Sequence, residues 1–110
     1  MSGELTWHQA CNSDDVDLED VLGVTIAGNR VAIYRSPDDR FYATEGLCTH
    51  EQVKLEDGLV MDDIIECPKH NGRFNYRTGE ARGAPACINL RTMPTKVEGG
   101  VVYVGLANAG

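Results

Sequence analysis

The chain has 110 residues, and ten Lys and Arg against seventeen Asp and Glu give a formal net charge of −7 at pH 7. This length accommodates a single domain, residues 1–110, around one hydrophobic core. The acidic balance argues against nucleic acid as a partner, because backbone binding needs clustered Lys and Arg. No apolar run approaches the roughly 20 residues of a membrane span, and no secretory signal is present. A cytoplasmic protein with reduced thiols is therefore expected.

Turn residues recur about every eight to twelve residues, and helical periodicity is weak. Trp7 and His8 are expected in a first strand. The acidic segment 12–21 is expected to form a helical turn capped by Asn12 or Ser13, or a loop. Short β-branched runs predict strands over residues 21–26, 31–35, 41–44, 55–60, 64–66, 74–76, 92–97 and 101–106. Turn chemistry predicts hairpins at Gly28-Asn29, Pro37-Asp38-Asp39, Asp57-Gly58 and Gly99-Gly100. The spacing predicts an all-β fold, an antiparallel sandwich or a barrel.

Two of the loops each carry one thiol and one imidazole. "LCTHEQ" holds Cys48 and His50, and "ECPKHNG" holds Cys67 and His70. The sixteen residues between His50 and Cys67 include the hairpin predicted at Asp57-Gly58. Because a hairpin returns the chain to its starting level, the two loops are expected to face one site. Turn formers in the second loop expose backbone N–H groups, which commonly hydrogen-bond cluster sulfides and thiolates.

Three kinds of site use such side chains. Tetrahedral zinc takes two Cys and two His, but its usual spacing pairs Cys with Cys and His with His. A Cys–His catalytic pair needs one residue of each kind and leaves the second pair unused. A Rieske-type [2Fe–2S] centre needs two thiolates on one iron and two imidazoles on the other. Two loops that each supply one of each kind meet this need, so the pattern favours the iron–sulfur centre.

The segment "CTHEQVKLEDGLVMDDIIECPKHNGRFNYRTGEARGAP" resembles the Rieske family signature: C-x-H, sixteen residues, C-x2-H, a "TGEA" turn and a proline-containing loop. The similarity runs through nearly the whole chain, and it is to the small ferredoxins of bacterial aromatic-ring-hydroxylating oxygenases. The resemblance implies a small antiparallel β-sandwich with a cluster-binding part at about residues 45–86, in which Ala84-Pro85 matches the proline loop. It also implies one [2Fe–2S] cluster per chain, with the ligands Cys48, His50, Cys67 and His70.

Departures from the respiratory-chain Rieske proteins predict a low reduction potential. Those proteins have an extra cysteine in each ligand loop, which form a disulfide, and here the matching positions are Val53 and Lys69. They also have Ser and Tyr hydroxyls that hydrogen-bond the cluster and a thiolate, where this chain has Gly72 and Phe74. The oxidised cluster with two thiolates and two neutral imidazoles sums to zero charge, so reduction gives −1. Fewer donors stabilise that negative state less, which places the potential towards the low end of the Rieske range, about −150 to +300 mV.

The remaining candidates carry weaker signals. Cys11 and Cys87 lie outside the motif and are expected to be small buried hydrophobes, and His8 is expected to be a surface or packing residue. Glu51, Gln52 and Lys69 lie beside the ligand histidines in the sequence, where they either help partners dock or are solvated. The acidic surface either steers an encounter with a basic protein patch or only keeps the protein soluble.

The resemblance implies an electron carrier and not an enzyme. Its partners would be a flavoprotein ferredoxin reductase and a terminal Rieske non-haem iron oxygenase, with neither membrane nor nucleic acid, and the chain would be a monomer. Two rivals stay open: a subunit or regulatory module such as the Rieske-like small subunit of a nitrite reductase, and a zinc-stabilised interaction domain. The complete ligand set counts against the first rival, and the ligand spacing counts against the second.

Overall fold

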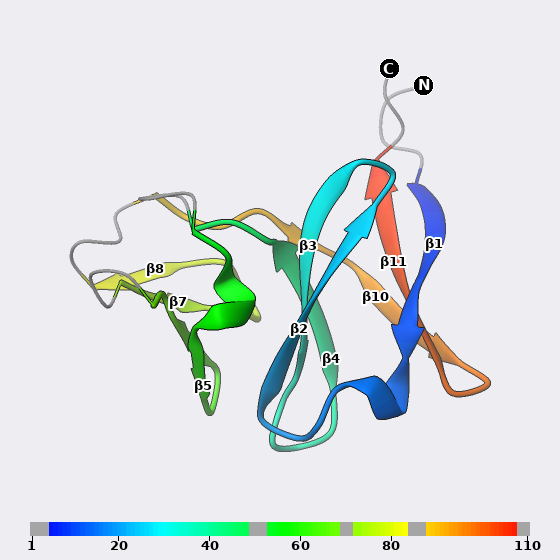
Figure 1. Cartoon of the computed structure of the whole chain (residues 1–110), viewed down its shortest axis with the longest axis horizontal. Coiled ribbons are helices and arrows are strands. Elements are labelled where there is room, and N and C mark those ends of the chain that lie inside the picture. Colours follow the sequence, from blue (N-terminus) through cyan, green and yellow to red (C-terminus); the bar gives the residue numbers. More distant parts are fainter. Residues whose placement is uncertain (1–4, 49–52, 69–71, 84–87, 108–110) are drawn as a thin grey trace.

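The structure is a computed structural model that describes residues 5–48, 53–68, 72–83 and 88–107 (Figure 1). In chain order these residues form β1 (Leu5–Asn12), η1 (Ser13–Asp15), β2 (Asp20–Ile26), β3 (Asn29–Arg35), β4 (Phe41–Glu45), η2 (Leu55–Asp57), β5 (Leu59–Met61), β6 (Ile64–Glu66), β7 (Arg73–Asn75), β8 (Ala81–Gly83), β9 (Thr92–Met93), β10 (Thr95–Glu98) and β11 (Val101–Ala107). The strands make three antiparallel sheets, ordered β1-β11-β10, β2-β3-β4-β9 and β5-β6-β7-β8. The prediction of an antiparallel all-β fold is confirmed. Both helices in the described ranges are 3-10 helices of three residues, far too short to span a membrane.

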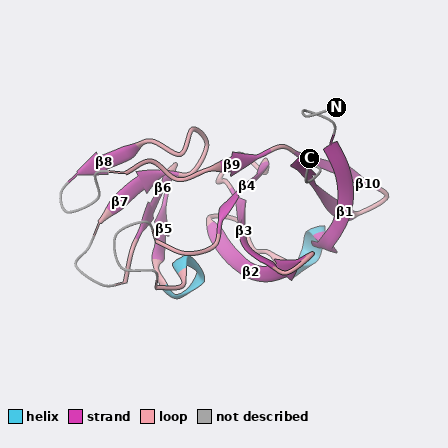
Figure 2. Ribbon diagram, turned by 90° about the horizontal axis from the view of Figure 1, so that it is seen from above, coloured by secondary structure: helices cyan, strands magenta, loops and turns pink. Residues whose placement is uncertain are grey.

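The sheet β2-β3-β4-β9 lies between the other two sheets (Figure 2). Its strand β3 is buried on both faces, because successive side chains of a strand point to opposite sides. Val31 and Ile33 belong to the core shared with the β1-β11-β10 sheet. Ala32 and Tyr34 belong to a second core, shared with the β5-β6-β7-β8 sheet. One continuous apolar run therefore serves two cores, and each large apolar side chain that it buries stabilises the fold by roughly 1.5–3 kcal/mol.

The hairpin predicted at Asp57-Gly58 is wrong. Residues 55–57 form the helix η2, and the chain reverses instead at Asp62 and Asp63, between β5 and β6. Gly58 has a φ of −89°, which any residue adopts. A Cβ atom at Gly58 would lie 2.1 Å from the carbonyl oxygen of Glu66, so the glycine is needed for this close approach and not for a turn.

Two other turns agree more closely with the sequence. The turn between β2 and β3 is centred on Ala27 and Gly28, whose φ values are 50° and 81°, one residue earlier than predicted. Two positive φ values are typical of the type I′ hairpin turn, and Gly99-Gly100 has them too, between β10 and β11. The acidic segment begins with η1, where the Asn12 N–H donates to the Asp15 carboxylate at 3.0 Å.

A buried tyrosine pair joins the middle sheet to the β5-β6-β7-β8 sheet. The rings of Tyr34 and Tyr76 are fully buried and stacked, with centroids 4.6 Å apart. The Tyr34 hydroxyl lies 2.9 Å from the hydroxyl of Thr44, which itself donates to the Glu45 carbonyl. Burial, and then the Asp63 carboxylate, raises the pKa of Tyr76 to about 12. This neutral, fully packed joint holds the two sheets together.

Removing the partner of the Tyr34 hydroxyl should cost more than removing the hydroxyl itself. Thr44→Val leaves that hydroxyl buried without an acceptor, and we expect a loss of about 1–3 kcal/mol in the free energy of unfolding. Tyr34→Phe leaves the Thr44 hydroxyl its bond to the Glu45 carbonyl, so we expect a loss of about 1 kcal/mol. Chemical denaturation measures both values, and a larger loss for Tyr34→Phe would contradict this account.

Candidate iron–sulfur centre

Each ligand loop is closed by a backbone hydrogen bond at its cysteine. The Cys48 N–H donates to the Val53 carbonyl at 2.8 Å, and the Cys67 N–H donates to the Gly72 carbonyl at 2.7 Å. Both bonds join a residue to the fifth residue after it, so the two loops have equal length. The sequence motif does not predict this closure, which depends on the pairing of the chain segments before and after each loop.

The first loop is anchored to the end of β4. Leu47 forms an isolated antiparallel bridge with Lys54. The Gly46 N–H donates to the Arg30 carbonyl at 2.9 Å, and the Leu55 N–H donates to the Gly46 carbonyl at 3.0 Å. Leu55 is fully buried. These contacts hold both ends of loop 48–53 against the middle sheet.

The second loop connects β6 to β7. Glu66 and Arg73 are paired in the register of these strands, and the Arg73 Nε lies 2.9 Å from the Glu66 Oε2. Gly58, directly after η2, approaches the Glu66 carbonyl closely. The chain leaving the first loop therefore packs against the residue that precedes Cys67. This contact places the bases of the two loops side by side.

Cys48 and Cys67 each have a relative exposure of 1% and belong to one core cluster, with Leu55, Phe74 and Tyr76. Two thiols in one buried core, at equivalent positions of two equal loops, fit an iron atom held by two thiolates. Within the described ranges, no three His, Cys, Asp or Glu side chains gather as metal ligands. Several predicted site residues lie outside the described residues: His50, Glu51, Gln52, Lys69, His70, Ala84-Pro85 and Cys87.

The described residues predicted to tune the site lie around this core. Val53 is half-buried and packs against it, and Phe74 is fully buried within it. Cys11 lies apart in β1, half-buried against the other core, and burial and then the Asp15 carboxylate raise the pKa of its thiol. His8 lies opposite Val104 in the same sheet, which confirms the predicted first strand.

Comparisons with known proteins agree with this arrangement. A profile of the Rieske [2Fe–2S] domain matches residues 6–94. The ferredoxin component of the naphthalene 1,2-dioxygenase system of Pseudomonas putida is 41% identical over 101 residues, covering 92% of this chain and 96% of that protein. The Sphingomonas yanoikuyae B1 ferredoxin superposes with a TM-score of 0.85 at 31% identity, covering 92% of this chain and 99% of that one.

This chain also resembles one chain of a solved protein complex. It is described as the complex of reduced oxygenase and oxidized ferredoxin in carbazole 1,9a-dioxygenase. The matching chain has a TM-score of 0.83 and 37% identity, covering 89% of this chain and 91% of that one. Each alignment spans nearly the full length of this chain and of the protein compared with it, so the likeness includes the sandwich as well as the ligand loops.

Proposed function

Because the chain belongs to the Rieske [2Fe–2S] domain family, we propose that it carries single electrons from a flavoprotein ferredoxin reductase to a terminal Rieske non-haem iron oxygenase of an aromatic-ring-hydroxylating system. Its cofactor is a [2Fe–2S] cluster, and the chain is a ferredoxin and not an enzyme. The paired burial of Cys48 and Cys67 in two equal loops is the observation that carries the proposal. The carrier is a single-domain monomer of the cytoplasm.

The ligand set divides between the loops. Cys48 and Cys67 hold one iron, and His50 and His70 hold the other, so that each loop contributes one thiolate and one imidazole. The cluster-binding part is the stretch of about residues 45–86. Two features support the assignment: the common core of the two cysteines, and the backbone contacts that place the loop bases side by side.

The chain's own residues set the conditions for electron transfer. When bound, the cluster takes up and releases one electron. Leu55 and Phe74 pack around the two cysteines and keep water from the thiolates. Neither Gly72 nor Phe74 has a side-chain donor, so the added negative charge receives little stabilisation from these positions. A reduction potential at the low end of the Rieske range suits a carrier that accepts electrons from a flavin.

A donor placed at position 74 should raise the reduction potential. Phe74→Tyr adds a hydroxyl to the core that holds both cysteines, and a hydrogen bond to a thiolate favours the reduced, more negative state. Phe41→Tyr is the control, because Phe41 packs against the other core. A redox titration followed by visible absorption measures both variants. An unchanged or lower potential for Phe74→Tyr would contradict the assignment of this position.

Spectroscopy of the purified protein tests the proposed function. A Rieske protein is reddish-brown and becomes EPR-active after one-electron reduction. A zinc-stabilised domain is colourless and EPR-silent, and that outcome would exclude electron transfer. Reconstitution with a reductase and an oxygenase then measures whether the chain transfers electrons between them.

A further inference from the structure

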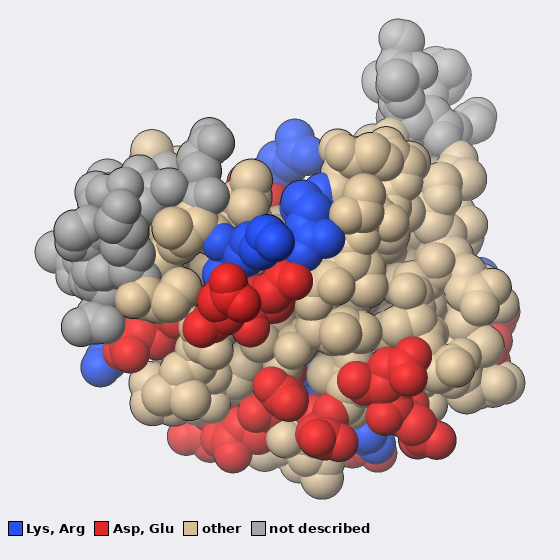
Figure 3. Space-filling model, in the orientation of Figure 1, with Lys and Arg blue, Asp and Glu red and all other residues tan. Residues whose placement is uncertain are grey.

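Carboxylates gather along one edge of the molecule. This acidic edge is formed by η1 and by the turns that follow β3 and β5, at the bottom of Figures 1 and 3. Arg77 joins two of these turns, with 3.0 Å between its guanidinium and Asp38 and 2.8 Å between it and Asp63. The acidic side chains of these segments are Asp14, Asp15, Asp38, Asp39, Asp62 and Asp63. Six of the seventeen acidic residues therefore lie away from the ligand loops.

Three cations surround the segment that leads into Cys48, and we call Arg30, Lys54 and Arg91 the basic group. Each is tied to residues 45–47 through its backbone. The Arg30 carbonyl accepts the Gly46 N–H, Lys54 is bridged to Leu47, and the Arg91 carbonyl accepts the Glu45 N–H at 2.9 Å. Figure 3 shows Lys and Arg side chains gathered in the middle of one face, between the sandwich and the β5-β6-β7-β8 sheet, with Asp and Glu side chains directly below them.

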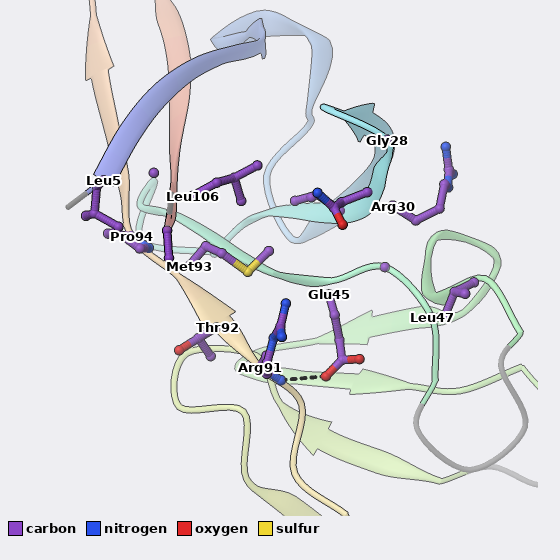
Figure 4. Close-up of a pocket in the computed structure, with 15 residues that line it drawn as sticks. Leu5, Gly28, Arg30, Glu45, Leu47, Arg91, Thr92, Met93, Pro94 and Leu106 are labelled. Carbon is purple, nitrogen blue, oxygen red and sulfur yellow. Dashed lines mark hydrogen bonds between the residues drawn. The ribbon is translucent and has the colours of Figure 1, made fainter. Parts of the chain in front are cut away.

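Two members of the basic group, Lys54 and Arg91, differ from Arg30 in their ion pairing within the described ranges. The Arg30 guanidinium pairs with Glu56 at 2.5 Å. Lys54 and Arg91 are exposed, and their side chains form no ion pair with any residue in the described part of the chain. The Glu45 carboxylate is held by the backbone N–H of Arg91 at 2.7 Å, while the Arg91 side chain extends past it towards Met93 (Figure 4).

Arg30, Glu45 and Arg91 line a groove at the open end of the sandwich, and Lys54 is bridged to Leu47 at its edge. Its volume is about 750 Å³. The walls include Leu5, Met93 and Leu106, and the lining continues through Arg91 to Leu47, the residue before Cys48 (Figure 4). A groove with apolar walls and the exposed Arg91, ending beside a ligand loop next to the exposed Lys54, is suited to a protein partner that presents carboxylates around its electron exit.

We propose that Lys54, Arg91 and this groove dock the electron-donating flavoprotein reductase through an acidic surface of that reductase. The inference rests on the proposed function. Attraction acts locally, because the Debye length at physiological salt is about 8 Å. The molecule measures 35 × 32 × 20 Å, so a partner at the ligand loops is largely screened from the acidic edge. At low ionic strength, where the Debye length is longer, repulsion also turns the acidic edge away from an acidic partner and the basic group towards it.

The negative charge that the chain gains on reduction favours the electron donor, and not the acceptor, as the acidic partner. With a cluster held by the ligand loops, reduction would add one negative charge near the segment 45–47, to which the basic group is tied. That charge weakens the attraction to an acidic partner, so the partner holds the oxidised form better than the reduced form. A donor must bind the oxidised carrier and release the reduced carrier, and an acceptor must do the opposite. Acidic complementarity therefore favours turnover at the reductase.

Charge-reversal variants test the surface with flavodoxin, an acidic flavoprotein, as the donor probe. Arg91→Glu and Lys54→Glu should each slow reduction of the chain by flavodoxin hydroquinone about tenfold at low ionic strength. Both should also weaken binding of oxidised flavodoxin, as calorimetry measures without electron transfer. The effects should shrink at about 0.5 M salt. Arg40→Glu is the matched control, since Arg40 is exposed beside the acidic edge and carries the same charge.

Each outcome decides the question. Similar effects of Arg40→Glu and Arg91→Glu would show that only net charge matters, and would overturn the proposal. The proposal would also be overturned if electron transfer from the reduced variants to cytochrome c, a basic acceptor, were slowed as much as their reduction by flavodoxin. The substitutions would then act on the cluster and not on docking. Failure of the proposed function looks different: the unmodified chain would lack the [2Fe–2S] spectrum or would not take up one electron from dithionite.

Discussion

Replacing His50 or His70 with alanine is expected to abolish the visible absorption of the oxidised protein and the EPR signal of the reduced protein. Each substitution removes one of the two imidazoles proposed to hold the second iron, and no methyl group can replace a metal ligand. Absorption spectra and iron determination on the purified variants measure the loss. Retention of an unchanged spectrum in either variant would sink the ligand assignment.

His8→Ala is the matched control for this experiment. His8 lies in β1, in the sheet β1-β11-β10, opposite Val104. The middle sheet separates it from the core that contains Cys48 and Cys67. The His8→Ala protein should therefore keep its full spectrum and iron content, which separates loss of a ligand from a general effect of removing histidine.

Gly79→Ala is expected to destabilise the protein by about 3 kcal/mol. Gly79 has a φ of +83°, and a Cβ atom there would lie 2.1 Å from the carbonyl oxygen of Leu90. The Gly79 carbonyl also accepts the Leu90 N–H at 2.7 Å, so moving these backbones apart breaks a hydrogen bond. Leu90 belongs to the core that contains Cys48 and Cys67, and the variant should also lose iron more readily.

Gly28→Ala separates the contribution of the φ angle from that of the contact. Gly28 has a φ of +81°, almost the same as Gly79, but no other atom lies within 4 Å of its Cβ position. Only the cost of the left-handed conformation applies there, about 1 kcal/mol. Denaturant unfolding of both variants measures the difference. Equal losses would mean that the approach of Leu90 to Gly79 contributes nothing.

The distribution of charge changes the interpretation of the acidic composition. A net charge of −7 by itself is compatible with docking to a basic partner. The carboxylates of the acidic edge, however, lie away from the segment that enters Cys48, and the basic group surrounds that segment. Composition measures total charge, whereas docking depends on the charges within about a Debye length of the contact.

The sequence by itself determined the class of site and the class of fold. The spacing of Cys48, His50, Cys67 and His70 is a local pattern, and ligand chemistry favours a Rieske centre over zinc. Most strands were also predictable, because alternating burial and hairpin turns depend on neighbouring residues. The run 31–34 shows the limit: its continuous apolar character marks a buried strand but does not name the two cores that it serves.

Contacts between distant segments were decided only by the tertiary structure. The sequence around Gly58 is typical of a hairpin turn, but the structure has the helix η2 there. Gly58 is needed for its close approach to the Glu66 carbonyl, a contact between segments that the local sequence does not show. Arg30, Lys54 and Arg91 come from three separate segments, and no periodicity links them. They meet because the backbone of residues 45–47 pairs with all three segments, and such pairing depends on the packing of whole sheets. Local pattern thus set the chemistry of the centre, and long-range pairing set the surface around it.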